Sequence, residues 1–319
     1  MPLTQLAIFI AGLIVLSWSA DRFVAGASGL AANLGVQPLL IGMTIMAMGS
    51  SAPEILIAIS ASVNDSNNLA IGNAIGSNIA NIGLVLGVTA LLRPLQVTSA
   101  SLKREMPMVM AVSVFAALLL ADSYLSVTEG YLLLVTFVAT LGALVWLSAR
   151  ATRSDPLVQE LTADIQQQHS KLFNLFWLIT GMILLPVSAH FMVEAATAIA
   201  RFYAISDLVI GLTIVAIGTS LPELAACVAS VVKKEQDLAL GNILGSNIFN
   251  ILAVLAVPAL LAPGGVDELV IQRDVPVMLV FTALVIFFSF AIRGKQRIEN
   301  WQGGLLLAGF VAFQFSLFP

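Results

Sequence analysis

Charge is scarce in this sequence. Asp, Glu, Lys and Arg make up only 10% of its 319 residues, whereas 59% are hydrophobic and the mean hydropathy is +0.99. Soluble domains carry about 25% charged residues. The shortage of charge therefore excludes an ordinary soluble domain and indicates a chain that crosses a lipid bilayer several times.

Other features are also missing. The single cysteine, Cys227, excludes an intrachain disulfide. The sequence has no HExxH or GxSxG motif and no nucleophile with an evident histidine partner, so we expect neither enzyme activity nor a cofactor. The basic residues stand in short clusters at the ends of apolar segments, which argues against a nucleic-acid-binding surface. Nothing indicates an obligatory protein partner.

The hydrophobic residues fall into about ten stretches, most of which reach the roughly 20 residues that a spanning helix needs. Continuous apolar runs favour helices over barrel strands. No basic residue precedes the first stretch, and no small-residue cleavage site follows it, so we expect it to be retained as a helix. The stretches lie near residues 3–24, 37–62, 69–92, 105–121, 128–148, 172–198, 206–232, 238–261, 274–292 and 301–318. The expected fold class is an all-α polytopic membrane protein with ten transmembrane helices.

If the chain crosses the membrane ten times, Lys and Arg are unevenly divided between the two sides of the membrane. Of the 14 basic residues, all but Arg201 and Arg273 fall on the side of the first connection. The positive-inside rule makes that side cytoplasmic. We therefore expect both termini to lie outside.

The two halves of the chain repeat each other. A shift of 169 residues aligns 36–87 with 205–256 and gives 23 identities in 52 positions without a gap. Because the repeating unit holds five helices, the second copy must enter the membrane from the opposite side, which is an inverted-topology repeat. We expect a first repeat at 1–148, a cytoplasmic linker at 149–171 and a second repeat at 172–319.

Polar residues within the apolar stretches recur in both copies, although a duplication without a function would let them diverge. A charged side chain at the bilayer centre costs at least about 2.5 kcal/mol, so Glu54 and its counterpart Glu223 must face protein, a wet cavity or a cation. A proline precedes each glutamate and disrupts the helix, which frees carbonyl oxygens at membrane depth. The other recurring pairs are Thr44 and Thr213, Ser51 and Ser220, Pro53 and Pro222, Asn73 and Asn242, Ser77 and Ser246, Asn78 and Asn247, and Asn81 and Asn250.

These residues together predict a binding site built only from oxygen atoms. Carboxylates, hydroxyls, amides and freed carbonyls suit hard cations, above all Ca²⁺ with roughly six to eight oxygens, or Na⁺. Ser77 and Asn81 are four residues apart and so share one helix face, as do Ser246 and Asn250. Hydrogen bonding between helices is the alternative interpretation of these serines and asparagines.

The segments GMTIMAMGSSAPE and GLTIVAIGTSLPE, followed by GNAIGSNIAN and GNILGSNIFN, resemble the alpha repeats of the cation/calcium antiporter superfamily, the sodium/calcium exchangers. The resemblance covers nearly the whole chain. It is greatest to the small prokaryotic members, which implies the cytoplasmic (inner) membrane. It also implies ten helices in two inverted five-helix repeats, with motifs at 42–87 and 211–256. The implied ion ligands are Glu54, Glu223, Ser51, Ser220, Ser77, Ser246, Asn81, Asn250, Ser50, Thr219 and the carbonyls of Ala47 and Ala216.

The resemblance implies a secondary antiporter that exchanges Ca²⁺ for Na⁺ by alternating access. Some similar proteins have an aspartate where this chain has Asn81 or Asn250, so the site here carries only two ionisable carboxylates. One Ca²⁺ or two monovalent cations would balance them. We expect electrogenic, Na⁺-driven exchange. Antiport of Ca²⁺ or Na⁺ against H⁺, K⁺-dependent Na⁺/Ca²⁺ exchange and, in another class, a cation channel remain alternatives.

Overall fold

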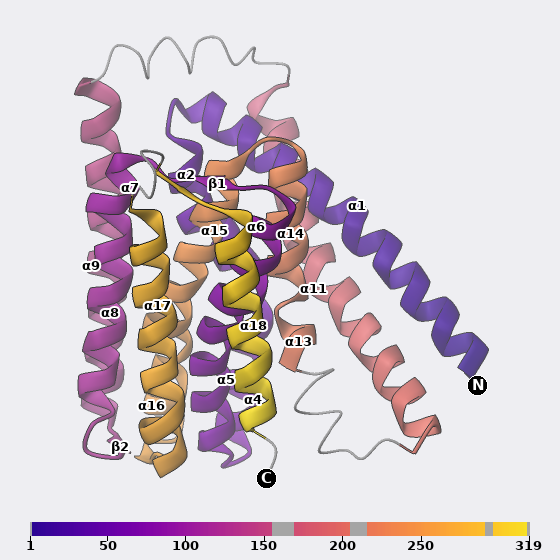
Figure 1. Cartoon of the computed structure of the whole chain (residues 1–319), viewed down its shortest axis with the longest axis vertical. Helices are drawn as coiled ribbons and strands as arrows, with labels where there is room; N and C mark the ends of the chain where they lie inside the picture. Colours follow the sequence, from indigo (N-terminus) through magenta and orange to yellow (C-terminus); the bar gives the residue numbers. More distant parts are fainter. Residues whose placement is uncertain (1, 155–168, 205–215, 291–295, 318–319) are drawn as a thin grey trace.

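The computed structural model describes residues 2–154, 169–204, 216–290 and 296–317 (Figure 1). Most of the predicted linker and the first five residues of the predicted second motif, 211–215, lie outside this part of the chain.

Nearly all of the described chain is helical. The α-helices are α1 (Pro2–Leu34), α2 (Pro38–Ile41), α3 (Ala47–Ser50), α4 (Ala52–Val63), α5 (Asn67–Ala80), α6 (Gly87–Leu92), α7 (Ser99–Lys103), α8 (Glu105–Leu119), α9 (Val127–Ser154), α11 (Lys171–Phe202), α13 (Ala216–Thr219), α14 (Leu221–Val232), α15 (Gln236–Phe249), α16 (Ala256–Leu261), α17 (Val275–Ser289) and α18 (Asn300–Ser316). Four π-helical segments are η1 (Gly42–Met46), η2 (Asn81–Leu86), η4 (Asn250–Val254) and η5 (Val270–Asp274). The two-residue strands β1 (Leu95–Gln96) and β4 (Arg297–Ile298) pair antiparallel, as do β2 (Tyr124–Leu125) and β3 (Gly264–Gly265).

Several helices are long and apolar enough to cross a bilayer. Among the described residues six qualify, and a seventh span is the pair Pro38–Ser50 and Ala52–Val63 if its bend of 43° is counted as one crossing. The six are Leu3–Leu34, Asn67–Leu92, Val127–Leu147, Lys171–Phe202, Gln236–Leu261 and Val270–Ser289. The prediction of a mostly helical, polytopic membrane protein is thereby confirmed.

Two spans form the centre of the bundle. In the most apolar window of Gln236–Leu261, 89% of the residues are buried, and in that of Asn67–Leu92, 72% are buried, against 22% in Leu3–Leu34. A Cβ atom added at Gly241 would lie only 2.5 Å from the Leu39 carbonyl oxygen and 3.0 Å from the Gly42 Cα. The backbone of α15 therefore lies directly against α2 and η1, as the spacing of its glycines favours.

The long helices α1 and α11 run side by side and lean away from the rest of the bundle toward the N-terminus of α1 (Figure 1). Their contact near the linker end is aromatic, with the Trp18 and Trp177 ring centroids 5.6 Å apart. At the same end α1 is tied to the turn between α14 and α15. Lys233 Nζ lies 2.7 Å from Asp21 Oδ1, and Ser28 Oγ donates to Glu235 Oε1 at 2.6 Å. The pair is thus held to the bundle at one end and separates from it at the other.

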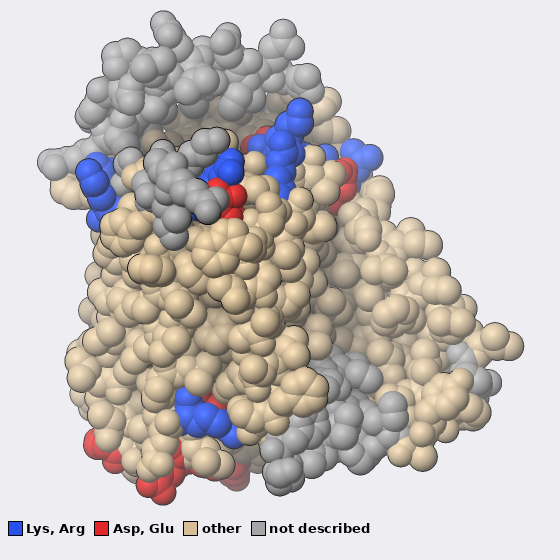
Figure 2. Space-filling model, viewed as in Figure 1, with Lys and Arg blue, Asp and Glu red and all other residues tan. Residues whose placement is uncertain are grey.

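Charged residues gather at the two ends of the molecule. In Figure 2 most of the visible Lys and Arg side chains lie at the end next to the linker, whereas acidic side chains dominate the opposite end. The wide band between them is almost free of charge on the visible face. Such a band is what a protein exposes to the hydrocarbon core of a bilayer.

Candidate functional site

Both glutamates stand directly after a break in a helix. Ser51 separates α3 from α4 with φ −87° and ψ 14°, and Ser220 separates α13 from α14 with φ −90° and ψ 4°. Proline occupies the first turn of each following helix, where its missing N–H leaves no hydrogen bond unmade. Glu54 and Glu223 therefore lie in the first turns of α4 and α14, where the helix dipole favours negative charge. The two breaks have nearly the same backbone geometry.

The predicted asparagine ligands also mark departures from α-helical geometry. Asn81 begins η2 directly after α5, and Asn250 begins η4 directly after α15. A π-helical turn shifts the i→i−4 hydrogen-bond pattern and occurs often at functional sites. A further π-segment, η1, precedes the break at Ser51.

The two carboxylates are buried and close to each other. Glu54 is 1% exposed and Glu223 is 0% exposed, and their charges repel each other. Within the part of the chain that the structure describes, the Oε2 atom of each is buried without a hydrogen-bond partner. Burying a carboxylate without a partner is expensive, and burying two side by side is more so, unless a cation neutralises them.

Serine hydroxyls link the two repeats across this site. Ser51 Oγ donates to Glu223 Oε1 at 2.9 Å. Ser50 Oγ donates to Asn242 Oδ1 at 3.2 Å. The helix break at Ser51 in the first repeat is thereby joined to α14 and α15 of the second repeat.

Other predicted ligands have buried polar atoms without partners. The Oγ atoms of Ser220 and Ser246 make no hydrogen bond to any described residue, nor does either amide atom of Asn250. In Asn81 the atom without a partner is the amide nitrogen, Nδ2. Ser77 is also buried, at 5% exposure. The unpartnered oxygens of Ser220, Ser246 and Asn250 in the second repeat, together with one carboxylate from each repeat, form the kind of donor set that a hard cation requires.

The remaining predicted ligands are backbone carbonyls and one threonine. The Ala47 carbonyl accepts the Ser51 amide at 3.0 Å and the Ser50 hydroxyl at 3.5 Å. Ala216 begins α13 and Thr219 ends it, so both stand just before the second break. Thr219 also lines a largely apolar cleft of about 800 Å³ between α4 and α11, which reaches Pro53.

The structure adds two residues that the predicted ligand set omitted. Asn73 Nδ2 donates to the backbone carbonyl of Glu54 at 3.4 Å. Its counterpart Asn242 accepts the Ser50 hydroxyl and donates to Cys227 Sγ at 3.5 Å. Their recurrence in both repeats was the signal that could have identified them as supports of the site.

Comparisons with known proteins show the family of the chain. The profile of the family described as "Sodium/calcium exchanger protein" matches residues 4–146 and 173–318. The chain is 47% identical over 307 residues to the putative antiporter CaxA of Alkalimonas amylolytica, covering 96% of each protein. It is 42% identical over 314 residues to the inner membrane protein YrbG of Escherichia coli (strain K12), covering 98% of this chain and 96% of that protein.

A solved structure is similar over the full length. The sodium-calcium exchanger NCX_Mj, soaked with 2.5 mM Na⁺ and 0.1 mM Ca²⁺, superposes with a TM-score of 0.85 at 35% sequence identity and covers 99% of both chains. On the evidence of its profile match, its relatives and its fold, this chain belongs to the sodium/calcium exchanger family.

Proposed function

We propose that this protein is a secondary antiporter that exchanges Ca²⁺ for Na⁺ across the membrane by alternating access. The observation that carries the proposal is the pair of buried carboxylates, Glu54 and Glu223, whose Oε2 atoms have no partner. Membership of the sodium/calcium exchanger family supports Na⁺ and Ca²⁺ as the transported ions. Membership of an exchanger family supports transport rather than catalysis.

The ion site is formed by the twelve residues that the sequence predicted, with the two glutamates as its central ligands. Ser51 joins the repeats by its bond to Glu223, and Ser220 and Ser246 contribute unpartnered hydroxyls. Asn81 and Asn250 contribute amide oxygens at the start of their π-segments. In this proposal Asn73 and Asn242 hold the two helix breaks in place without touching the ion.

The architecture proposed for this function has ten transmembrane helices in two inverted five-helix repeats, residues 1–148 and 172–319, joined by a cytoplasmic linker at 149–171. The matching backbone angles at Ser51 and Ser220 support it. So do the similar lengths of the counterpart helices α1 and α11, 33 and 32 residues. Helices such as α8 and α18 are shorter than a usual span and complete the count in this proposal.

We place the chain in the inner membrane of a prokaryote, with both termini outside, and assign this conformation to the state open to the outside. The name of YrbG supports the membrane, and the basic side chains near the linker support the orientation. The Asp21–Lys233 ion pair ties α1 to the turn between α14 and α15 at the linker end, whereas the cleft between α4 and α11 lies in the other half. In the state open to the cytoplasm, Asp21 on α1 would separate from Lys233.

Orientation and state can be tested with one cysteine in a Cys227→Ala background. Ser60 is exposed and lines the cleft, so we expect Ser60→Cys to react with a membrane-impermeant maleimide added to right-side-out vesicles. Gln96→Cys is the control, because Gln96 is exposed at the linker end and should react only after permeabilisation. Labelling of Gln96→Cys in intact vesicles with protection of Ser60→Cys would reverse the assignment.

The carboxylates can be tested one at a time. Glu54→Gln and Glu223→Gln each remove half of the site's formal charge while keeping its volume. Removing one partner of a buried charge pair costs about 2–5 kcal/mol, so we expect Ca²⁺ affinity to fall by about 30-fold or more and ⁴⁵Ca²⁺ flux in proteoliposomes to be lost. Ser62→Ala is a matched control, since Ser62 is buried on α4 at 3% exposure and is not among the twelve proposed ligands. Normal flux in either glutamine variant, with folded protein, would assign that glutamate a structural role.

The driving ion and the charge moved can be measured together. We propose more than two Na⁺ per Ca²⁺, because the hydroxyls and freed carbonyls provide oxygens for additional Na⁺ without a third carboxylate. Each turnover then moves net charge, and the membrane potential contributes about 2.3 kcal/mol per charge per 100 mV. Each cycle brings two positive charges in with Ca²⁺ and takes more than two out with Na⁺, so Na⁺-dependent Ca²⁺ uptake into proteoliposomes should increase when a valinomycin-clamped K⁺ potential makes the lumen positive relative to a zero-potential control. Parallel vesicles clamped with a protonophore in place of valinomycin, free of K⁺, provide the test of K⁺ dependence.

Four outcomes would change the proposal. Uptake that ignores the potential means electroneutral exchange. Uptake driven by a pH gradient without Na⁺ favours the proton-coupled alternative, and a strict need for K⁺ favours K⁺-dependent exchange. Ca²⁺ conductance at channel rates without any counter-ion gradient would instead indicate a cation channel.

A further inference from the structure

Asn78 and Asn247 are counterparts in the two repeats, yet their hydrogen bonds differ. Asn78 Nδ2 donates to the backbone carbonyl of Asn247 at 3.2 Å. Asn247 is 1% exposed, but among the residues that the structure describes neither its Nδ2 nor its Oδ1 has a partner. An unpaired buried polar group costs about 1–3 kcal/mol, so an amide left unpaired at both ends calls for a partner outside the protein.

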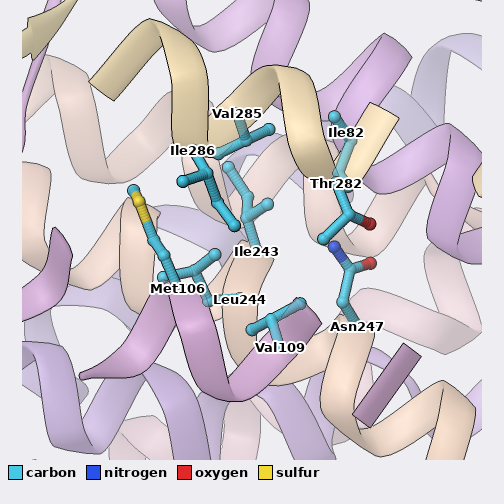
Figure 3. A pocket seen from close by; sticks show the side chains of 9 residues that line it. All are labelled: Ile82, Met106, Val109, Ile243, Leu244, Asn247, Thr282, Val285 and Ile286. Carbon is cyan, nitrogen blue, oxygen red and sulfur yellow. The ribbon is translucent and has the colours of Figure 1, made fainter. Parts of the chain in front are cut away.

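A small space lies beside this amide. Figure 3 shows a pocket with the side chains of Asn247 and Thr282 next to each other at one side and apolar side chains such as Val109, Ile243 and Val285 around the rest. The pocket leaves about 10 Å³ for the centre of a water-sized sphere. A single water molecule needs roughly 10–15 Å³ by this measure, and two water molecules need more than the pocket has.

Thr282 supplies the second polar group. Its Oγ1 donates to the Met278 carbonyl at 2.8 Å, so the hydroxyl proton is engaged and the oxygen lone pairs remain to accept. The pocket therefore offers one donor, Asn247 Nδ2, and two acceptors, Asn247 Oδ1 and Thr282 Oγ1. Buried water molecules typically make two to four hydrogen bonds to such groups.

We propose that one structural water molecule occupies this pocket, accepts a hydrogen bond from Asn247 Nδ2 and donates to Thr282 Oγ1, with Asn247 Oδ1 in reach of its second proton. A metal ion is a poor occupant, because the lining residues include no carboxylate and offer two neutral side-chain oxygens, whereas Ca²⁺ takes roughly six to eight. The pocket is also too small for an organic molecule.

The water molecule gives Asn247 a partner within its own repeat, whereas its counterpart Asn78 bonds to the other repeat. On one side of the pseudo-two-fold axis, Asn78 reaches the other repeat directly. On the other side, the water molecule connects Asn247 on α15 to Thr282 on α17. Asn247 stands between Ser246 and Asn250, so the bridge fixes α15 against α17 beside two proposed ligands. The water site itself does not depend on which ions the protein exchanges.

The test compares two buried threonines. Thr282→Val keeps the shape and removes the oxygen that holds the water molecule. Thr89→Val is the matched control, because Thr89 is fully buried and its Oγ1 likewise bonds within its helix, to the Val85 carbonyl at 2.6 Å, but it does not line the pocket. Crystal structures that resolve ordered water should show a peak within hydrogen-bond reach of Asn247 Nδ2 in the unmodified protein and in Thr89→Val, and none in Thr282→Val.

Stability gives an independent measurement. Because Cys227 is the single cysteine and is buried, a thiol-reactive dye reports unfolding directly. We expect Thr282→Val to melt at least about 2 °C below Thr89→Val. Adding Asn247→Leu to Thr282→Val should restore part of the loss, since the unpaired amide is then gone. An empty pocket in the unmodified protein, an Asn247 bonded to protein instead, or a peak that behaves as a cation in an anomalous map would overturn the proposal.

Discussion

Two carboxylates buried side by side in an apolar bundle are the constraint on which this structure depends. Glu54 and Glu223 together are almost inaccessible, repel each other and keep unpartnered oxygens. Nearby hydroxyl groups donate hydrogen bonds to only some of the carboxylate oxygens, as Ser51 Oγ does to Glu223 Oε1 at 2.9 Å. Such an arrangement is costly in a membrane unless bound cations or protons neutralise it, which suits a site whose ions bind on one side of the membrane and leave on the other.

The helices are shaped to serve that requirement. A continuous α-helix would present few polar atoms at this depth, since its carbonyls are bonded within it. The bends at Ser51 and Ser220 and the π-segments that begin at Asn81 and Asn250 interrupt that regularity in both repeats. The close approach of Gly241 to the backbone of α2 and η1 brings the broken helix of one repeat against the central helix of the other.

The sequence alone predicts the membrane class, the family resemblance and the residues that surround the site, because polar residues that recur in apolar segments are visible without a structure. The difference in hydrogen bonding between equivalent residues of the two repeats is not predictable from the sequence. Because the two motifs are nearly equivalent in sequence, they cannot indicate that the Ser51 hydroxyl bonds to the other repeat while the Ser220 hydroxyl has no partner among the described residues. No residue preference in the sequence marks the π-segments. The length of an apolar stretch also predicts one continuous helix where the structure has several pieces, as at Ser51, because proline and π-turns divide the span. Asn73 and Asn242 were visible as recurring residues, but their supporting contacts required coordinates.

The most direct test of the account is the position of a bound cation. An anomalous difference map from crystals loaded with Sr²⁺ as a substitute for Ca²⁺ should show one strong peak between the Glu54 and Glu223 carboxylates. The peak should weaken as Na⁺ is raised and disappear in the Glu223→Gln variant. A map without a peak at the two carboxylates, or one whose peak survives in Glu223→Gln at full height, would contradict the claim that this pair is the ion-binding centre.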